Sequence, residues 1–334
     1  MSSAPSAAPP AREIVRDARW LAQALDPNAG VVRLIEMTPD GYRAASFLDD
    51  RMLQAPVHSV TRPFAEIAAA IPADARGDAR WIFHIGHVGS TLLARLLGEL
   101  HGVLAVREPR ILRDVAASGR RDQYVPAVRK LLSRTFAPGE IALVKATSFV
   151  SEIAAELVVS GERALFLYAK PRHYIASILA GENSVRELAA LADSRSRRMA
   201  ERVRGLSGHG PAHLAAAAWA CEMTALEAAA EAMADRHVRW ADFDALLGDI
   251  EGALAGLAQF FGFEASDERV REIARGPLMG RYSKALEYEY SPSLRRELIE
   301  QEIRLQGRAI DEAVAMLAQV AKDSPLLAST LARS

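Results

Sequence analysis

A glycine-containing turn between a predicted strand and a predicted helix is the part of this sequence best suited to bind an anion. The segment reads FHIGHVGSTLLARLL and begins at Phe83. Its apolar start predicts a buried strand, and its leucine spacing predicts a helix after the turn. Glycines let successive backbone N–H groups converge, and the start of a helix adds partial positive charge. The residues expected to form this phosphate-type site are Gly86, His87, Val88, Gly89, Ser90 and Thr91.

The same turn has a plainer interpretation. The hydroxyl groups of Ser90 and Thr91 can donate to an anion, but they can also cap a helix. A strand–turn–helix junction with a Ser/Thr cap therefore stays open as the alternative. The segment is not a Walker A loop, because the pattern G-x-x-x-x-G-K-[ST] is absent and no lysine precedes the hydroxyls.

Short apolar runs alternate with helical patterns in the middle of the chain, and this indicates βα units around a parallel sheet. The expected strands lie at residues 81–85, 141–144 and 164–168, and the expected helices lie at 92–100, at 149–159 and from Pro171 onward. Lys145 follows the second strand, at the carboxyl end where α/β active sites gather. A lysine at the rim of the sheet is the alternative.

The flanking regions define the expected domain organisation. Residues 1–10 are rich in Ala, Ser and Pro and are predicted to be a disordered tail. Residues 11–80 form an N-terminal extension, and residues 81–334 form the α/β domain with a mostly helical C-terminal half. The extension is expected to contain a helix at 11–25, a strand at 31–37 and a turn at 39–41. The C-terminal half is expected to contain helices at 211–235, at 249–261 before a Gly262 C-cap and from Ser291 onward, and a strand at 237–240.

The turn and its helix resemble the 5′-phosphosulfate-binding loop of sulfotransferases, which reads approximately G-x-P-[RK]-S-G-T-T-x-L-x-x-x-L after the first strand. Gly89, Ser90 and Thr91 match the G-T-T part. His87 stands at the basic position and Gly86 at the proline, and both are departures. The resemblance covers roughly residues 81–290 and is partly to tyrosylprotein sulfotransferases. It implies a three-layer, P-loop NTPase-like α/β domain with a central parallel sheet.

A second segment, LFLYAKPRHYIAS, resembles the 3′-phosphate-binding segment of the same family, R-[ND]-P-[RK]-D-x-x-x-S after a strand. Pro171, Arg172 and Ser177 fit this pattern, whereas Ala169 stands where the family has arginine. Lys170 is adjacent and can replace that charge, since either cation can meet a phosphate. The alternative is an ordinary junction whose basic side chains are solvated.

The resemblance also implies which residues catalyse the transfer. Glu108 lies where tyrosylprotein sulfotransferases have an acidic general base. Small-molecule sulfotransferases have a catalytic histidine in a K-T-H strand end, which here reads K-A-T from Lys145 onward. The base is therefore expected to be Glu108, with His87 and Lys145 stabilising developing charge. The alternative is a surface glutamate paired with Arg107 or Arg110.

A third segment, GRYSKALEY, resembles a late Ser-Lys loop that closes over the nucleotide in related enzymes. Its candidates are Arg281, Ser283 and Lys284. A solvated arginine-containing loop is the alternative.

Composition limits the other classes of function. The net charge of −1 argues against a nucleic-acid binder held by bulk positive charge. The single cysteine, Cys221, excludes an internal disulfide and a cysteine-built zinc site, and it is expected to be an inert packed thiol. No apolar run approaches the roughly 20 residues of a membrane span, and the N-terminus lacks an apolar signal region. A cytoplasmic protein is expected, and the preference for arginine over lysine is typical of a GC-rich bacterial genome.

The expected function is transfer of a sulfonate from 3′-phosphoadenosine-5′-phosphosulfate (PAPS) to a hydroxyl or amine of a small-molecule or peptide acceptor. The product nucleotide would be 3′-phosphoadenosine-5′-phosphate (PAP), and no metal is expected. A P-loop kinase or other nucleotide-dependent enzyme stays open, as does a nucleotide-binding protein without activity. The sequence leaves a homodimer open.

Overall fold

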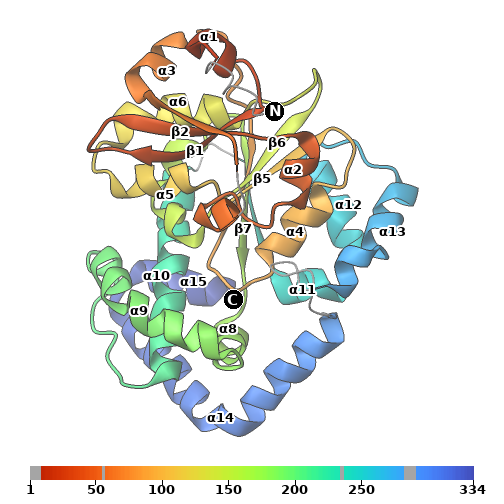
Figure 1. The fold of residues 1–334 in the computed structure, drawn as a ribbon. Helices are drawn as coiled ribbons and strands as arrows, with labels where there is room; N and C mark the ends of the chain where they lie inside the picture. Colours follow the sequence, from red (N-terminus) through yellow and green to blue (C-terminus); the bar gives the residue numbers. More distant parts are fainter. Residues whose placement is uncertain (1–8, 55–56, 234–236, 282–290) are drawn as a thin grey trace.

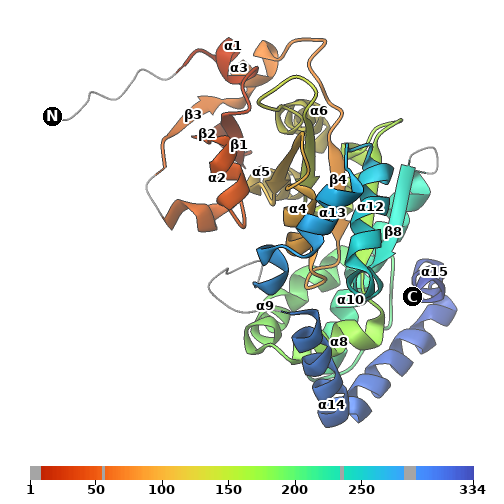
Figure 2. The same ribbon diagram turned by 90° about the vertical axis from the view of Figure 1, so that its right-hand side faces the viewer.

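A five-stranded parallel sheet forms the centre of the computed structural model, which describes residues 9–54, 57–233, 237–281 and 291–334. Its strands are β4 (Arg80–His84), β5 (Val103–Arg107), β6 (Ile141–Lys145), β7 (Arg163–Tyr168) and β8 (His237–Asp242). They lie in the order β5-β6-β4-β7-β8, and every neighbouring pair is parallel. Helices cover both faces (Figures 1 and 2). The predicted α/β fold with a central parallel sheet is confirmed.

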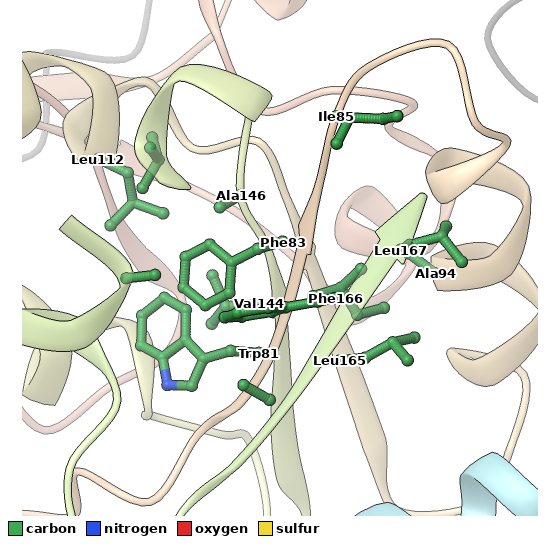
Figure 3. Close-up of a cluster of buried hydrophobic side chains, with 14 of the residues drawn as sticks. Trp81, Phe83, Ile85, Ala94, Leu112, Val144, Ala146, Leu165, Phe166 and Leu167 are labelled. Carbon is green, nitrogen blue, oxygen red and sulfur yellow. The ribbon is translucent and has the colours of Figure 1, made fainter. Parts of the chain in front are cut away.

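The strands are short apolar runs because both faces of the sheet are covered. Trp81 and Phe83 stack at 5.9 Å between ring centroids, and Phe83 meets Phe166 edge to face at 5.7 Å. These rings lie among aliphatic side chains of β6 and β7, including Val144 and Leu165 (Figure 3). The packing of this core fixes the ends of the strands, and with them the loops that follow.

The order of the strands creates a switch point beside β4. After β4 the chain builds β5 and β6 on one side, and then it crosses to build β7 and β8 on the other. In open α/β sheets, ligands bind in the crevice outside the carboxyl ends of the strands at such a point. The loop after β4 therefore leaves the sheet where a ligand site is expected.

The helices after the strands follow the predicted order. Those next to the site are α4 (Ser90–Leu97), α5 (Arg110–Ala117), η2 (Ser148–Ile153), α8 (Pro171–Leu179), α9 (Glu182–Met199) and α11 (Phe243–Gly248). Those of the outer layers are α6 (Arg121–Leu132), α7 (Ala154–Leu157), α10 (Pro211–Ala232), α12 (Ile250–Phe261), α13 (Asp267–Ala274), η3 (Pro277–Gly280), α14 (Pro292–Val320), η4 (Ala321–Asp323) and α15 (Pro325–Arg333). Gly262 ends α12 in the left-handed region, and Ser291 caps α14, as predicted. The mostly helical C-terminal half is confirmed.

Some predicted elements are different in the structure. Strand β5 was not among the predicted strands. The helix expected at 149–159 is a 3₁₀ helix followed by the short α7. The helix expected at 92–100 begins two residues earlier, at Ser90, and ends at Leu97.

The N-terminal extension contains a second, antiparallel sheet, which Figure 1 shows in red and orange beside the central one. Its strands are β1 (Trp20–Asp26), β2 (Val31–Glu36) and β3 (Ser59–Pro63), and its helices are α1 (Ala11–Ile14), α2 (Pro39–Ala44), η1 (Asp50–Gln54) and α3 (Phe64–Ala70). The strand predicted at 31–37 is confirmed. The helix predicted at 11–25 is wrong beyond Ile14, because β1 pairs with β2 and is buried over most of its length. An apolar run of that kind cannot be told from a helix by periodicity alone.

Two buried arginines fasten this extension to the central domain. The turn expected at 39–41 is the first turn of α2, whose last carbonyls accept hydrogen bonds from Arg95 and Arg107. Burial lowers the pKa of both guanidinium groups, that of Arg107 to about 9. The Leu48 N–H also donates to the Arg107 carbonyl at 2.8 Å. The segment after α2 is thereby held at the carboxyl end of β5, beside the expected ligand site.

Two further expectations concern Cys221 and the membrane. Cys221 is fully buried in α10, and burial raises the pKa of its thiol to about 12, in agreement with an inert thiol. In the described part of the chain, no helix has both the length and the apolar character needed to cross a bilayer. The predicted tail lies almost wholly outside the described residues, and the proposed domain boundaries stay predictions.

Candidate active site

The turn after β4 has the backbone geometry of an anion-binding loop. Gly86, His87 and Gly89 have φ angles of 81°, 53° and 62°, all in the left-handed region. A Cβ atom on Gly89 would lie 1.8 Å from Cζ of the buried Phe243, so only glycine fits there. The Gly86 N–H donates to Nδ1 of His84 at 2.9 Å, which fixes the start of the turn. His87 holds a conformation that is unfavourable for a residue with a Cβ, and such strain is typical of functional loops.

A cavity of about 770 Å³ opens at this turn, within the size range of small-molecule sites. Its walls come from the turn and α4, the ends of β5 and β6, the N-terminal extension, α8, α9 and α14. The lining residues used below are Phe47, Asp49, Arg51, Gly86, His87, Gly89, Ser90, Thr91, Glu108, Lys145, Ser177, Ser184, Glu187, Leu191, Arg195, Leu294, Arg295 and Leu298. All predicted residues of the loop except Val88 line the same cavity as Glu108 and Lys145. Val88 is buried and does not line it.

Lys145 and Glu108 form a buried ion pair at the floor of the cavity. Lys145 Nζ pairs with Glu108 Oε1 and donates to Thr91 Oγ1 at 3.2 Å. The two side chains are 1% and 8% exposed. The Glu108 N–H donates to the Lys145 carbonyl at 2.7 Å. Glu108 has a φ of 53°, in the left-handed region that favours glycine. The pair joins the ends of β5 and β6 to the first turn of α4.

The N-terminal extension adds an arginine that no sequence motif indicated. Arg51 Nη2 lies 3.0 Å from Glu108 Oε2 and 2.7 Å from Asp49 Oδ2, and its guanidinium lies 3.3 Å from the centroid of Phe47. Its side chain is half exposed. Each carboxylate oxygen of Glu108 therefore contacts a cation: Oε1 contacts the buried Lys145, and Oε2 contacts the half-exposed Arg51.

The alternative in which Glu108 is a surface glutamate is wrong. Glu108 is buried, and its partners are Lys145 and Arg51. Arg107 donates to backbone carbonyls instead, and Arg110 pairs with Asp50 and Asp114.

His87 faces helix α9 across the cavity. Its Nε2 lies 3.7 Å from Glu187 Oε2, and its Nδ1 lies 3.4 Å from Ser184 Oγ. Neither α9 residue carried a signal in the sequence.

The residues predicted to bind a 3′-phosphate are only partly brought together. Ser177 lines the cavity, and its hydroxyl donates to the Tyr174 carbonyl at 2.8 Å. Lys170 is exposed at the start of α8, and Arg172 pairs with Asp311 of α14; neither lines the cavity. The exposed Arg281 does not line it either, and Ser283 and Lys284 lie outside the described residues.

Two arginines of the helical half line the cavity in addition. Arg295 of α14 donates to Asp244 Oδ1 at 3.2 Å and lies 5.4 Å from the ring centroid of Phe243, the residue that packs on Gly89. Arg195 of α9 lies near Glu187. The cavity thus offers backbone N–H groups, hydroxyls and guanidinium groups, which are donors that suit anionic ligands.

No family model matches the chain, and no curated protein matches it. Two solved structures that are similar to it are both sulfotransferases. The sulfotransferase domain from the curacin biosynthetic pathway matches with a TM-score of 0.43 and 13% identity, over 67% of this chain and 89% of that one. Mouse sulfotransferase SULT7A1, complexed with PAP, matches with a TM-score of 0.41 and 13% identity, over 78% of this chain and 90% of that one.

Proposed function

We propose that the chain is a PAPS-dependent sulfotransferase whose acceptor group is a hydroxyl or an amine. The observation that carries this proposal is the buried Lys145, which lies between Thr91 of the anion-binding turn and Glu108. A fixed cation at this place can stabilise negative charge on a group held by the turn. The resemblance of the turn to the 5′-phosphosulfate loop supports the same assignment.

The partners of Glu108 favour sulfonate transfer over phosphoryl transfer. Kinases and related enzymes place a metal ion, held by carboxylates, against the transferred group. Here both oxygens of Glu108, which shares Lys145 with Thr91 of the turn, are engaged by Lys145 and Arg51. Side-chain cations thus engage this carboxylate, and this supports a transfer stabilised by the protein's own charges.

The residues of the chain then have distinct tasks. The N–H groups of residues 86–91 would hold the 5′-phosphosulfate, and Ser177, which lines the cavity on α8, would contact the nucleotide. Lys170, Arg172, Arg281, Ser283 and Lys284 stay proposed ligands of the nucleotide, on the resemblance alone. Bound PAPS supplies an activated sulfonate whose S–O bond to the 5′-phosphate breaks with the electron pair on the phosphate oxygen.

Glu108 is the proposed general base. An ionised carboxylate has about four acceptor sites, so a carboxylate that contacts Lys145 and Arg51 can also take up a proton. It would accept the acceptor's proton as the acceptor oxygen or nitrogen bonds to sulfur. Lys145 and His87 would stabilise the charge that develops on the sulfonate and on the leaving phosphate. Positioning and electrostatics dominate such a transfer.

A transfer assay tests the proposal. The protein is incubated with ³⁵S-labelled PAPS and pools of phenols, alcohols, amines and tyrosine peptides, and in parallel with ATP, Mg²⁺ and the same pools. In the reaction with PAPS we expect label in an acceptor fraction and an equal amount of PAP. In the reaction with ATP we expect no ADP. Formation of ADP with a phosphorylated acceptor would replace the proposal by a kinase. Tight binding of PAP with no transfer to any pool would assign a binding protein without activity.

A further inference from the structure

We propose that the acceptor of this site is an amphiphilic anion: a hydroxyl or amine compound with an apolar body and a separate carboxylate, phosphate or sulfate group. The apolar body would pack on Leu191, Leu294 and Leu298, and the anionic group would bind Arg195. The inference rests on the proposed function, because it names the acceptor class of that site.

Exposed leucines gather at this cavity. Among the residues that the structure describes, four large hydrophobic side chains are classed as exposed: Leu191, Leu294, Leu298 and Leu305. The first three are 39%, 41% and 44% exposed, and all three line the cavity. Single exposed leucines are ordinary on a protein surface, but a group that lines one concave site indicates a ligand with apolar surface.

Arg195 adjoins a mostly buried ionic network in which two other arginines already engage Glu152 and Glu222. Arg198 makes two hydrogen bonds of 2.8 Å to Glu222, and Arg202 binds both oxygens of Glu152. Arg198 also donates to Glu152. These two glutamates are thus taken by two arginines, and Arg195 lies beside the network as a third arginine.

The charge of Arg195 is poorly matched. Its nearest carboxylates are Glu222, at 4.0 Å, and the half-exposed Glu187, at 3.7 Å. Arg195 is only 9% exposed. Its Nε and Nη1 atoms are buried, and neither has a hydrogen-bond partner among the described residues. Buried donors are nearly always satisfied. A ligand carboxylate or phosphate in the adjoining cavity would provide the acceptors, after a rotation of the guanidinium.

The positions of Leu191 and Arg195 allow one ligand to meet both. They are four residues apart on α9 and so lie on the same face of that helix. Leu294 and Leu298 have the same spacing on α14. The two helices thus present an apolar wall with a cation at one end. An amphiphilic anion would use both the apolar wall and the cation, so we assign the anion at Arg195 to the acceptor.

Binding of unreactive probes tests the proposal without any transfer step. The probes are hexanoate, octanoate and decanoate, with decanol as the uncharged counterpart, titrated by calorimetry in the presence and absence of PAP. We expect the Kd of the carboxylates to fall two- to fourfold for each added methylene, as apolar burial requires. Decanoate should bind at least tenfold more tightly than decanol, because a charge-assisted pair is lost with the alcohol.

Variants with matched controls separate the two parts of the site. Arg195→Gln should weaken decanoate at least tenfold and leave decanol unchanged, whereas Arg186→Gln, on the exposed side of the same helix, should change neither. Leu298→Ser should weaken both probes at least threefold, whereas Leu305→Ser, outside the cavity, should change neither. Should Arg195→Gln fail to fold, Arg195→Lys and Leu298→Ser carry the test.

The contrary results are distinct. Equal binding of decanoate and decanol to the wild type, or no effect of Leu298→Ser, would overturn the proposal. Weaker PAP binding to Arg195→Gln with unchanged decanoate binding would assign the arginine to the nucleotide instead. Normal probe binding in a protein that does not bind PAP would leave the amphiphile site standing and remove the proposed function.

Discussion

Replacement of Lys145 by methionine is expected to lower the free energy of unfolding by about 2–4 kcal/mol. Removing one partner of a buried ion pair typically costs about 3–5 kcal/mol, because the other charge stays buried without compensation. Arg51 still contacts Glu108 in the variant and offsets part of that loss. Urea unfolding followed by circular dichroism measures the change.

Two controls show whether the lower free energy of unfolding comes from the buried Glu108 carboxylate that has lost Lys145. The double variant Lys145→Met/Glu108→Gln should recover at least half of the stability, since no buried charge is then left unpaired. Lys322→Met, at an exposed lysine, should stay within about 0.5 kcal/mol of the wild type. If Lys145→Met were as stable as the wild type, the result would contradict a buried ion pair between Lys145 and Glu108.

Glu108→Gln should reduce the single-turnover rate of sulfonate transfer by about 10²–10⁴-fold, the contribution of a general base. The amide keeps the shape of the side chain and can still accept from Lys145, but it does not take up the acceptor's proton. The affinity for PAP should therefore change little. Rapid-quench measurement of the rate and calorimetric titration of PAP on the same variant check both statements.

The competing account is that Glu108 only holds Lys145 and Arg51 in place. The variant would then melt at a lower temperature and transfer sulfonate at a nearly normal rate. In that case the base passes to His87, which Glu187 and Ser184 contact, and His87→Asn becomes the variant that stops transfer.

The central domain could be predicted from the sequence because its signals are local. The strands predicted at 81–85, 141–144 and 164–168 are apolar runs followed within three residues by Gly86, Lys145 and Pro171. The turn from Gly86 to Thr91 was found for the same reason: its glycines and hydroxyls are adjacent in the chain. Lys145 was found because it follows a predicted strand at the edge of the sheet where active sites gather, and Glu108 was found through the resemblance to tyrosylprotein sulfotransferases.

The rest of the site is made by contacts between distant segments, which no local pattern records. Arg51 contacts Glu108 from a segment that follows α2, and Arg95 and Arg107 hold the end of α2 against the central domain. Arg195 and Arg295 come from long helices in which an arginine usually indicates a solvated face. For Arg172 the motif gave the residue but not the direction of its side chain, and Asp311 of α14 binds it.

The central claim is that the turn after β4 and its surroundings bind a nucleotide with both a 5′-phosphate-type group and a 3′-phosphate. The most direct test is calorimetric titration of PAP, ADP and AMP into the wild-type protein without metal. PAP should bind at least tenfold more tightly than ADP and AMP, because the charge-assisted contacts to the 3′-phosphate are absent from the other two. Equal affinities for PAP and ADP would contradict the account and favour an enzyme that uses ATP.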